Sequence, residues 1–86
     1  MKYRLPRHAE WEIGRRQIPS DWLTSVLERP QQRIRQPTGT DILQSRFTGQ
    51  DGKMFLLRAV VNTATDPAVV VTVYRTSKIE KYWRPE

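Results

Sequence analysis

The chain has 86 residues, no cysteine and one histidine, so it is sized for one small domain without a disulfide framework and is poorly suited to a zinc site. Fifteen lysines and arginines against nine aspartates and glutamates give a net charge of +6, which favours an anionic partner such as RNA, DNA or an acidic protein. No apolar run approaches the roughly 18 residues of a membrane span and the amino end has no signal-like stretch, so we expect a soluble cytoplasmic protein that uses no membrane, metal or cofactor.

Two helices are predicted in the first third of the chain. Pro6 suits the first turn of a helix, where its missing N–H costs nothing, and this helix is expected to run to about residue 17. Residues 1–4 are either frayed or form a short extra strand. A second helix starts after Pro19 and ends before Pro30, because the residue that precedes a proline is pushed out of the helical region. Its apolar residues recur at helical spacing, as Trp22, Leu23, Val26 and Leu27.

Four strands follow, because the apolar period changes to two after Pro30. They are expected over residues 32–36, 42–48, 53–62 and 68–75. Ser77 and Glu80 have the spacing of a capping box, which predicts a short helix from Lys78. The prediction is an α+β domain over residues 1–86, in which two N-terminal helices pack on one face of a four-stranded, largely antiparallel sheet and a short helix closes the chain.

The two-residue period assigns the strand side chains to two sheet faces. One face is apolar and should pack on the helices through Leu43, Phe47, Phe55, Leu57, Ala59 and Val61. The interior is also expected to hold Val71 and the tryptophans Trp11, Trp22 and Trp83. The other face carries the polar residues Arg46, Arg58, Thr72 and Tyr74. Such side chains on three successive strands are suited to holding a phosphodiester, and the alternative is a face that is merely solvated.

Several parts of the chain together resemble a known group of proteins. They are His8 within the first helix, Arg16 and Ile18 before the second, and the closing residues 70–74, 76–78 and 81–82. This pattern resembles a bacterial family of small domains that is grouped with the barnase–EndoU–colicin–RelE ribonuclease-like superfamily, over about residues 3 to 83. Members often carry an arginine one turn after the histidine, where this chain has Glu12.

The resemblance implies a metal-independent endoribonuclease, commonly the toxin of a toxin–antitoxin pair, with RNA as substrate and a cognate antitoxin as protein partner. Metal-free cleavage uses the neighbouring 2′-hydroxyl as nucleophile, so the protein must supply a proton acceptor, a proton donor and phosphate stabilisation. The catalytic candidates are His8, Arg58 and Tyr74, of which His8 is the only side chain whose unperturbed pKa lies near neutrality. The candidates for substrate binding are Arg16, Arg46, Thr72, Lys78 and Lys81.

Each of these assignments has a plainer alternative. A lone histidine near a helix start is often a surface residue, Tyr74 can be a packing residue, and the lysines can be solvated. Two other classes of function also stay open. A nucleic-acid-binding module without catalysis would need the basic face but not His8, and a protein-interaction module would use the same surface to bind an acidic partner.

Overall fold

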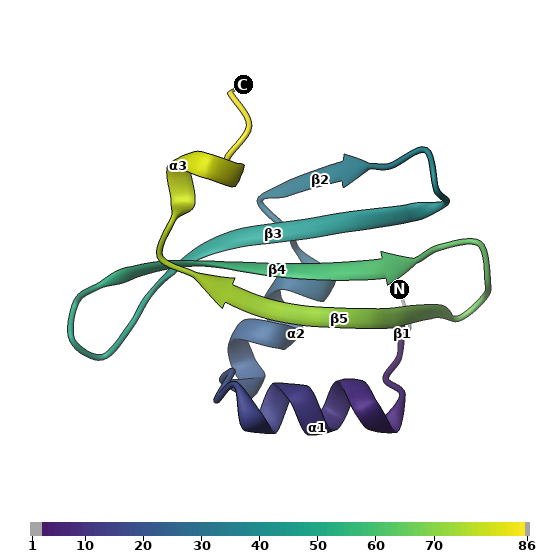
Figure 1. The fold of residues 1–86 in the computed structure, drawn as a ribbon, viewed down its shortest axis with the longest axis horizontal. Helices are drawn as coiled ribbons and strands as arrows, with labels where there is room; N and C mark the ends of the chain where they lie inside the picture. Colours follow the sequence, from purple (N-terminus) through teal and green to yellow (C-terminus); the bar gives the residue numbers. More distant parts are fainter. Residues whose placement is uncertain (1–2, 86) are drawn as a thin grey trace.

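A computed structural model describes residues 3–85 and has three helices and a five-stranded sheet within that range. In chain order the elements are β1 (Tyr3–Arg4), α1 (Arg7–Arg15), α2 (Ser20–Glu28), β2 (Gln32–Arg35), β3 (Thr40–Thr48), β4 (Met54–Asn62), β5 (Ala68–Thr76) and α3 (Ile79–Tyr82) (Figure 1). The predicted α+β class is confirmed. No helix of residues 3–85 has the length and apolar character needed to cross a membrane.

The sheet has the strand order β1-β5-β4-β3-β2. Strands β2 to β5 are antiparallel to their neighbours, as predicted, whereas β1 runs parallel to β5 with Tyr3 opposite Ala68. The count of four strands is therefore wrong, because the alternative of a short extra strand at the amino end is the one that the fold adopts. Two residues are too few to show a period, so the pattern could not decide between the alternatives. Residues 1 and 2 lie outside the described part of the chain.

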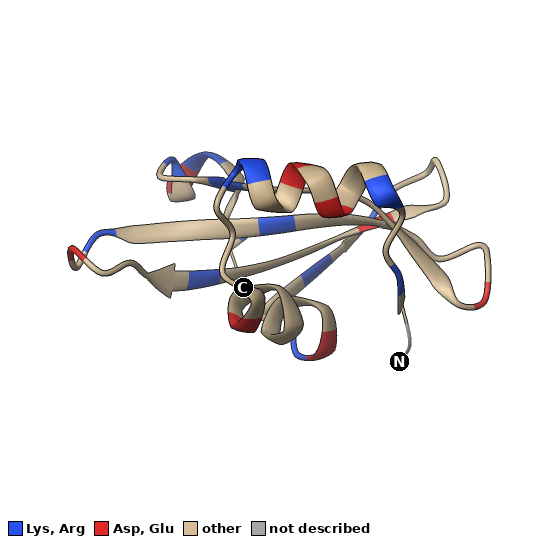
Figure 2. Cartoon of the chain, turned by 90° about the horizontal axis from the view of Figure 1, so that it is seen from below, with Lys and Arg blue, Asp and Glu red and all other residues tan. Residues whose placement is uncertain are grey.

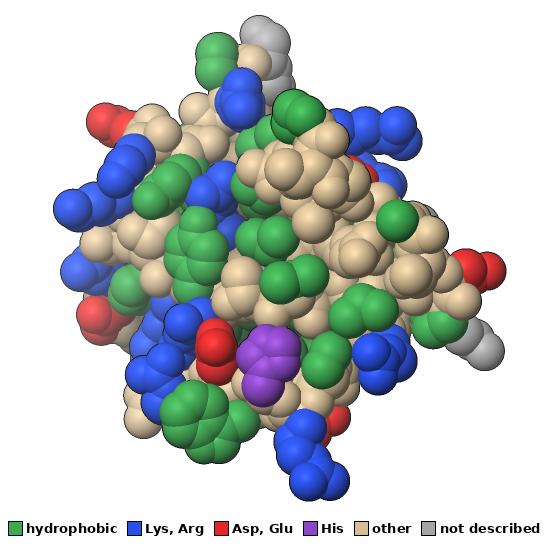
Figure 3. All heavy atoms as spheres, turned by 45° about the vertical axis from the view of Figure 1, so that its right-hand side comes forward, with side chains coloured by type: hydrophobic (Ala, Val, Ile, Leu, Met, Phe, Trp, Pro, Cys, Tyr) green, Lys and Arg blue, Asp and Glu red, His purple; other side chains and the backbone are tan. Residues whose placement is uncertain are grey.

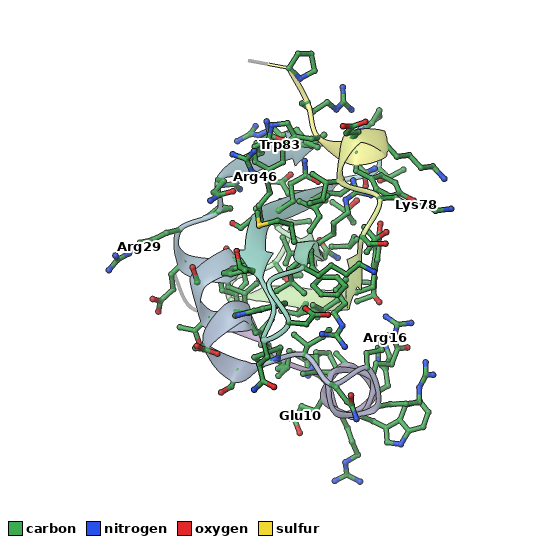
Figure 4. All side chains as sticks on the ribbon, turned by 90° about the vertical axis from the view of Figure 1, so that its left-hand side faces the viewer. Glu10, Arg16, Arg29, Arg46, Lys78 and Trp83 are labelled. Carbon is green, nitrogen blue, oxygen red and sulfur yellow. The ribbon has the colours of Figure 1, made fainter. Side chains whose placement is uncertain are left out.

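The two long helices occupy different positions on the sheet. α2 packs against β3 and β4 and lies on one face, whereas α1 runs alongside β5 (Figures 1 and 4). Within residues 3–85, β5 has no strand partner on its outer side other than the short β1. α1 covers the rest of that edge, where Arg16 donates a hydrogen bond of 2.7 Å from Nη1 to the Val73 carbonyl. The prediction that both helices share one face is correct for α2 and wrong for α1.

The core lies between α2 and one sheet face, which we call the core face. Its buried residues are Ile18, Val26, Leu43, Leu57, Ala59, Val61, Val70 and Val73. Trp22 of α2 stacks on Phe47 of β3 with ring centroids 4.8 Å apart, so this tryptophan is in the predicted place. Trp11 is 64% exposed on α1, and its predicted place in the core is wrong.

A β-bulge in β5 overturns another prediction. Val60 pairs with Thr72 and Val61 with Val70, so Val71 is the extra residue that has no partner on β4. Val71 is therefore 39% exposed instead of interior. The bulge lets Val70 and Val73 both face the core, while Thr72 and Tyr74 point to the opposite face.

The last helix begins without the expected capping box. No side chain caps the start of α3, and the Lys78 backbone N–H donates to the Thr76 hydroxyl at 3.1 Å. α3 is a single turn that lies over the sheet face opposite α2 (Figure 1). We call this face the Arg58 face, defined by Gln44, Arg46, Arg58, Thr72 and Tyr74.

Candidate functional site

Arg58 is the centre of the Arg58 face and is only 7% exposed. Its Nε donates to the Gln44 side-chain carbonyl at 2.9 Å and its Nη1 donates to the Tyr74 hydroxyl at 2.6 Å. The Tyr82 ring lies 4.1 Å from the guanidinium carbon, in the geometry of a cation–π contact. Adjacent strands supply the first two partners, because Gln44 and Tyr74 flank Arg58 across the β3–β4 and β4–β5 pairs.

No carboxylate balances the charge of Arg58 within the described residues. The two ion pairs found there join Arg16 to Glu12 and Arg33 to Asp41. Burying a charge costs free energy unless an opposite charge pairs with it. Neutral hydrogen-bond acceptors and an aromatic ring face offset only part of that free energy. No fully buried polar side-chain atom in this part of the chain lacks a partner. The Nη2 atom of Arg58 forms no hydrogen bond within the described residues, so its N–H groups have no acceptor there.

Arg16 lies at the α1 side of the same site and has a mainly structural set of partners. Its Nη1 is 3.0 Å from Glu12 Oε2, 2.7 Å from the Val73 carbonyl and 3.3 Å from the Thr72 hydroxyl. Figure 4 shows Arg16 between α1 and the sheet. Arg16 therefore anchors α1 on β5. It also lines, with Tyr74 and Arg75, a hollow of about 480 Å³ beside the Tyr74 phenol.

Arg46 lies on the same face beside the C-terminal segment. Its guanidinium stacks over the Trp83 ring at 4.1 Å, and the two side chains lie together in Figure 4. The segment is held in place by Gln32, whose side-chain amide pairs with both the N–H and the carbonyl of Arg84 at 3.1 and 2.7 Å. Gln44 adds a bond to the Tyr82 carbonyl at 3.2 Å. This segment covers part of the Arg58 face, so the face is not simply solvated.

His8 is not brought into contact with Arg58 or Tyr74. It is exposed on α1 and makes no hydrogen bond or ion pair within the described residues. Figure 3 shows it at the surface in purple. His8 shares a helix stripe with Glu12 and Arg16, but a rise of 1.5 Å per residue places it about 12 Å from Arg16 along the axis. Basic residues stand at both ends of α1 and acidic ones between them (Figure 2).

The two lysines proposed for substrate binding belong to the α3 turn. Lys78 and Lys81 are both exposed, and Lys81 Nζ lies 5.3 Å from the centre of the Tyr82 ring. They border a hollow of about 610 Å³ that Lys53 and Met54 line from the other side. Among the eight candidates, side-chain hydrogen bonds connect Arg58 with Tyr74 and Arg16 with Thr72. The other four, His8, Arg46, Lys78 and Lys81, form no side-chain hydrogen bond with these pairs within the described residues.

Sequence reasoning missed three residues that shape the site. Gln44 and Tyr82 contact the Arg58 guanidinium, and Arg75 lines the hollow beside Tyr74. Gln44 had a usable signal, because a hairpin centred on residues 50–52 places it opposite Arg58. Tyr82 had none, since its position depends on how the last turn folds back.

Comparison with known proteins adds no further constraint to this geometry. No protein-family model, curated protein or solved structure matches the chain.

Proposed function

We propose that this protein is a metal-independent endoribonuclease that holds an RNA phosphodiester at the Arg58–Tyr74 pair. The observation that carries the proposal is a buried guanidinium without a carboxylate partner among residues 3–85. Arginine is the side chain whose planar fork fits phosphate oxygens best. A phosphate group at Nη2 would supply the negative charge that Arg58 otherwise lacks.

The pair can act on the phosphate in two ways. Because Arg58 donates to the Tyr74 oxygen, the phenol keeps its own O–H free to donate elsewhere. In the proposed reaction the 2′-oxygen of the substrate forms a bond to phosphorus and the bond from phosphorus to O5′ breaks. The 2′-proton passes to a base on the protein, and O5′ receives a proton from an acid. The products are a 2′,3′-cyclic phosphate and a 5′-hydroxyl.

In this proposal Arg58 stabilises the charge that develops on the phosphate, and Tyr74 donates a hydrogen bond or a proton there. His8 is the proton acceptor that the family resemblance implies, although the structure does not bring it into contact with Arg58 or Tyr74. The roles of a toxin and of a cognate antitoxin stay predictions from the family resemblance, and a cytoplasmic location stays a prediction from the apolar pattern of the sequence.

One observation favours a second function. His8 makes no contact with the Arg58–Tyr74 pair, so the site holds a phosphate-binding group without an adjacent base. A protein that binds RNA without cleaving it would need only the phosphate-binding group. The two functions differ in whether the RNA backbone is broken.

Purified protein incubated with an end-labelled RNA in the presence of EDTA separates them. An endoribonuclease yields fragments that end in a 2′,3′-cyclic phosphate, and a 2′-O-methyl RNA of the same sequence stays intact. Tyr74→Phe, purified in the same way, should lose the activity and so excludes a contaminating nuclease. His8→Ala should slow cleavage by about 10²–10⁴-fold with little loss of binding. Retention of the RNA without any cleavage would replace the enzyme by the binding protein.

A further inference from the structure

A third hollow lies on the Arg58 face beside the C-terminal segment. It has a volume of about 530 Å³ and is lined by Arg46, Met54, Ile79, Glu80, Trp83 and Pro85. Four of these six side chains are apolar, and Met54 is 43% exposed although it belongs to a strand. The size falls within the range of about 300–1,000 Å³ that is usual for small-ligand pockets.

The Arg46–Trp83 stack gives this hollow a fixed polar edge. The ring holds the guanidinium plane at 4.1 Å, and the Arg46 side chain forms no hydrogen bond or ion pair within the described residues. Its N–H donors therefore stay available for a planar acceptor. A wall of Met54, Ile79 and Trp83 with free guanidinium donors at its edge matches a nucleobase, which has an apolar face and polar edges.

The residues of this hollow are neighbours of the proposed phosphate site along β3 and the C-terminal segment. Arg46 lies two residues after Gln44 on β3, and Gln44 is the cross-strand partner of Arg58. Trp83 follows Tyr82, whose ring covers Arg58. A single strand of RNA with one phosphate at Arg58 would thus carry a neighbouring base toward Trp83.

The charges around the hollow also suit RNA. The neighbouring hollow shares Met54, Ile79 and Glu80 and adds Lys53, Lys78 and Lys81. Among the described residues, Glu80 is the one carboxylate that lines either hollow, against three lysines and Arg46. By contrast, the hollow at the opposite end of the sheet has Arg33 and Arg35 facing Asp41 and Asp66. That balance of charge gives no preference for a polyanion.

We propose that this hollow is a base-binding subsite, in which an unpaired RNA base packs on Trp83, Met54 and Ile79 with its edge toward Arg46. The proposal rests on the proposed function, since it takes RNA as the ligand of the Arg58 face. Stacking on an aromatic side chain is tolerant of base identity. The subsite therefore raises the affinity of the protein for RNA, whichever base lies next to the bound phosphate.

The chain contains a matched control for Trp83. Trp11 is also contacted by an arginine, with the Arg15 guanidinium carbon 5.1 Å from the ring centre. Trp11 is 64% exposed on α1 and lines none of the hollows described above. The two tryptophans thus share their chemistry and differ in their surroundings.

The test measures the affinity of three proteins for two probes by fluorescence anisotropy. The proteins are the parent, Trp83→Ala and Trp11→Ala, and the probes are a short 2′-O-methyl RNA and an abasic oligomer of the same length. The parent should bind the RNA about 5- to 150-fold more tightly than the abasic oligomer. Trp83→Ala should remove this difference and leave the affinity for the abasic oligomer unchanged, which also shows that the fold is intact. Trp11→Ala should behave as the parent, and Trp83→Phe should recover most of the difference.

Equal affinity of the parent for both probes would overturn the subsite and leave the phosphate site standing. An equal loss in Trp83→Ala and Trp11→Ala would do the same, because it would mean that any surface tryptophan contributes. Failure of the parent to bind either probe would overturn the proposed function together with the subsite.

Discussion

Arg33 and Arg58 belong to the same sheet and differ in what balances their charge. Arg33 of β2 donates from Nε to the buried carboxylate of Asp41 at 2.6 Å, and its side chain is 41% exposed. Arg58 of β4 is more deeply buried, yet its hydrogen bonds go to the neutral acceptors of Gln44 and Tyr74. Arg33 and Asp41 balance each other's charge, whereas Arg58 has no carboxylate partner within residues 3–85 and can take up a bound anion.

The difference separates a structural arginine from a candidate functional one. An arginine that neutralises a buried aspartate stabilises the fold and has no charge left for a ligand. An arginine held by neutral groups keeps its full charge at a fixed position, which is what preorganised stabilisation of a phosphate needs.

The largest expected effect is on cleavage by Arg58→Lys. Lysine keeps the charge but cannot bond Gln44, Tyr74 and a phosphate with one planar fork, so single-turnover cleavage should slow by about 10²–10³-fold. Arg35→Lys, on exposed β2, is the matched control and should cleave at the parent's rate. Cleavage by Arg58→Lys close to that of the parent would remove Arg58 from the reaction.

A smaller effect is expected on stability from Arg33→Met. This change leaves the Asp41 carboxylate buried without its partner and should lower the free energy of unfolding by about 1–3 kcal/mol, measured by urea denaturation. RNA affinity of the folded variant should match that of the parent. A variant that keeps its stability but loses RNA binding would assign to Arg33 the role proposed for Arg58.

The smallest effect is on the salt dependence of RNA binding. Each phosphate contact with single-stranded RNA contributes about 0.7 to the slope of log affinity against log salt concentration. Arg58→Gln should therefore make the slope shallower by about that amount, and Arg33→Gln should not change it. Equal slopes for the parent and Arg58→Gln would show that no phosphate is neutralised at this position.

The order of the elements could be predicted from the sequence, because the helical and two-residue periods are properties of local apolar spacing. Leu57 is completely buried, as the alternation on β4 predicts. Val71 was misassigned because a bulge shifts the alternation by one residue, and three adjacent valines contain no sign of where that shift occurs. The two-residue β1 and the edge position of α1 depend on tertiary packing rather than on local pattern.

The candidate site was predictable only where it depends on alternation along strands. Arg58 and Tyr74 were placed on one face by that rule, and the structure puts them in contact across β4 and β5. The burial of Arg58 could not be foreseen, because the ring that covers it comes from Tyr82 after the last strand. His8 was grouped with them through the family resemblance, and which residues of α1 reach the Arg58 face depends on how α1 lies along β5.

The most direct test of the central claim compares Arg33 and Arg58 in one titration. Both Nε–H groups are hydrogen-bonded, to Asp41 and Gln44, so both should give observable ¹H–¹⁵N signals in nuclear magnetic resonance spectra. A 2′-O-methyl dinucleotide, which has a phosphodiester but cannot be cleaved, is the ligand to titrate. We predict that phosphate binding produces a saturable shift of the Arg58 Nε–H signal and no shift of the Arg33 signal. An unchanged Arg58 signal at saturating ligand, or equal shifts of both signals, would contradict it.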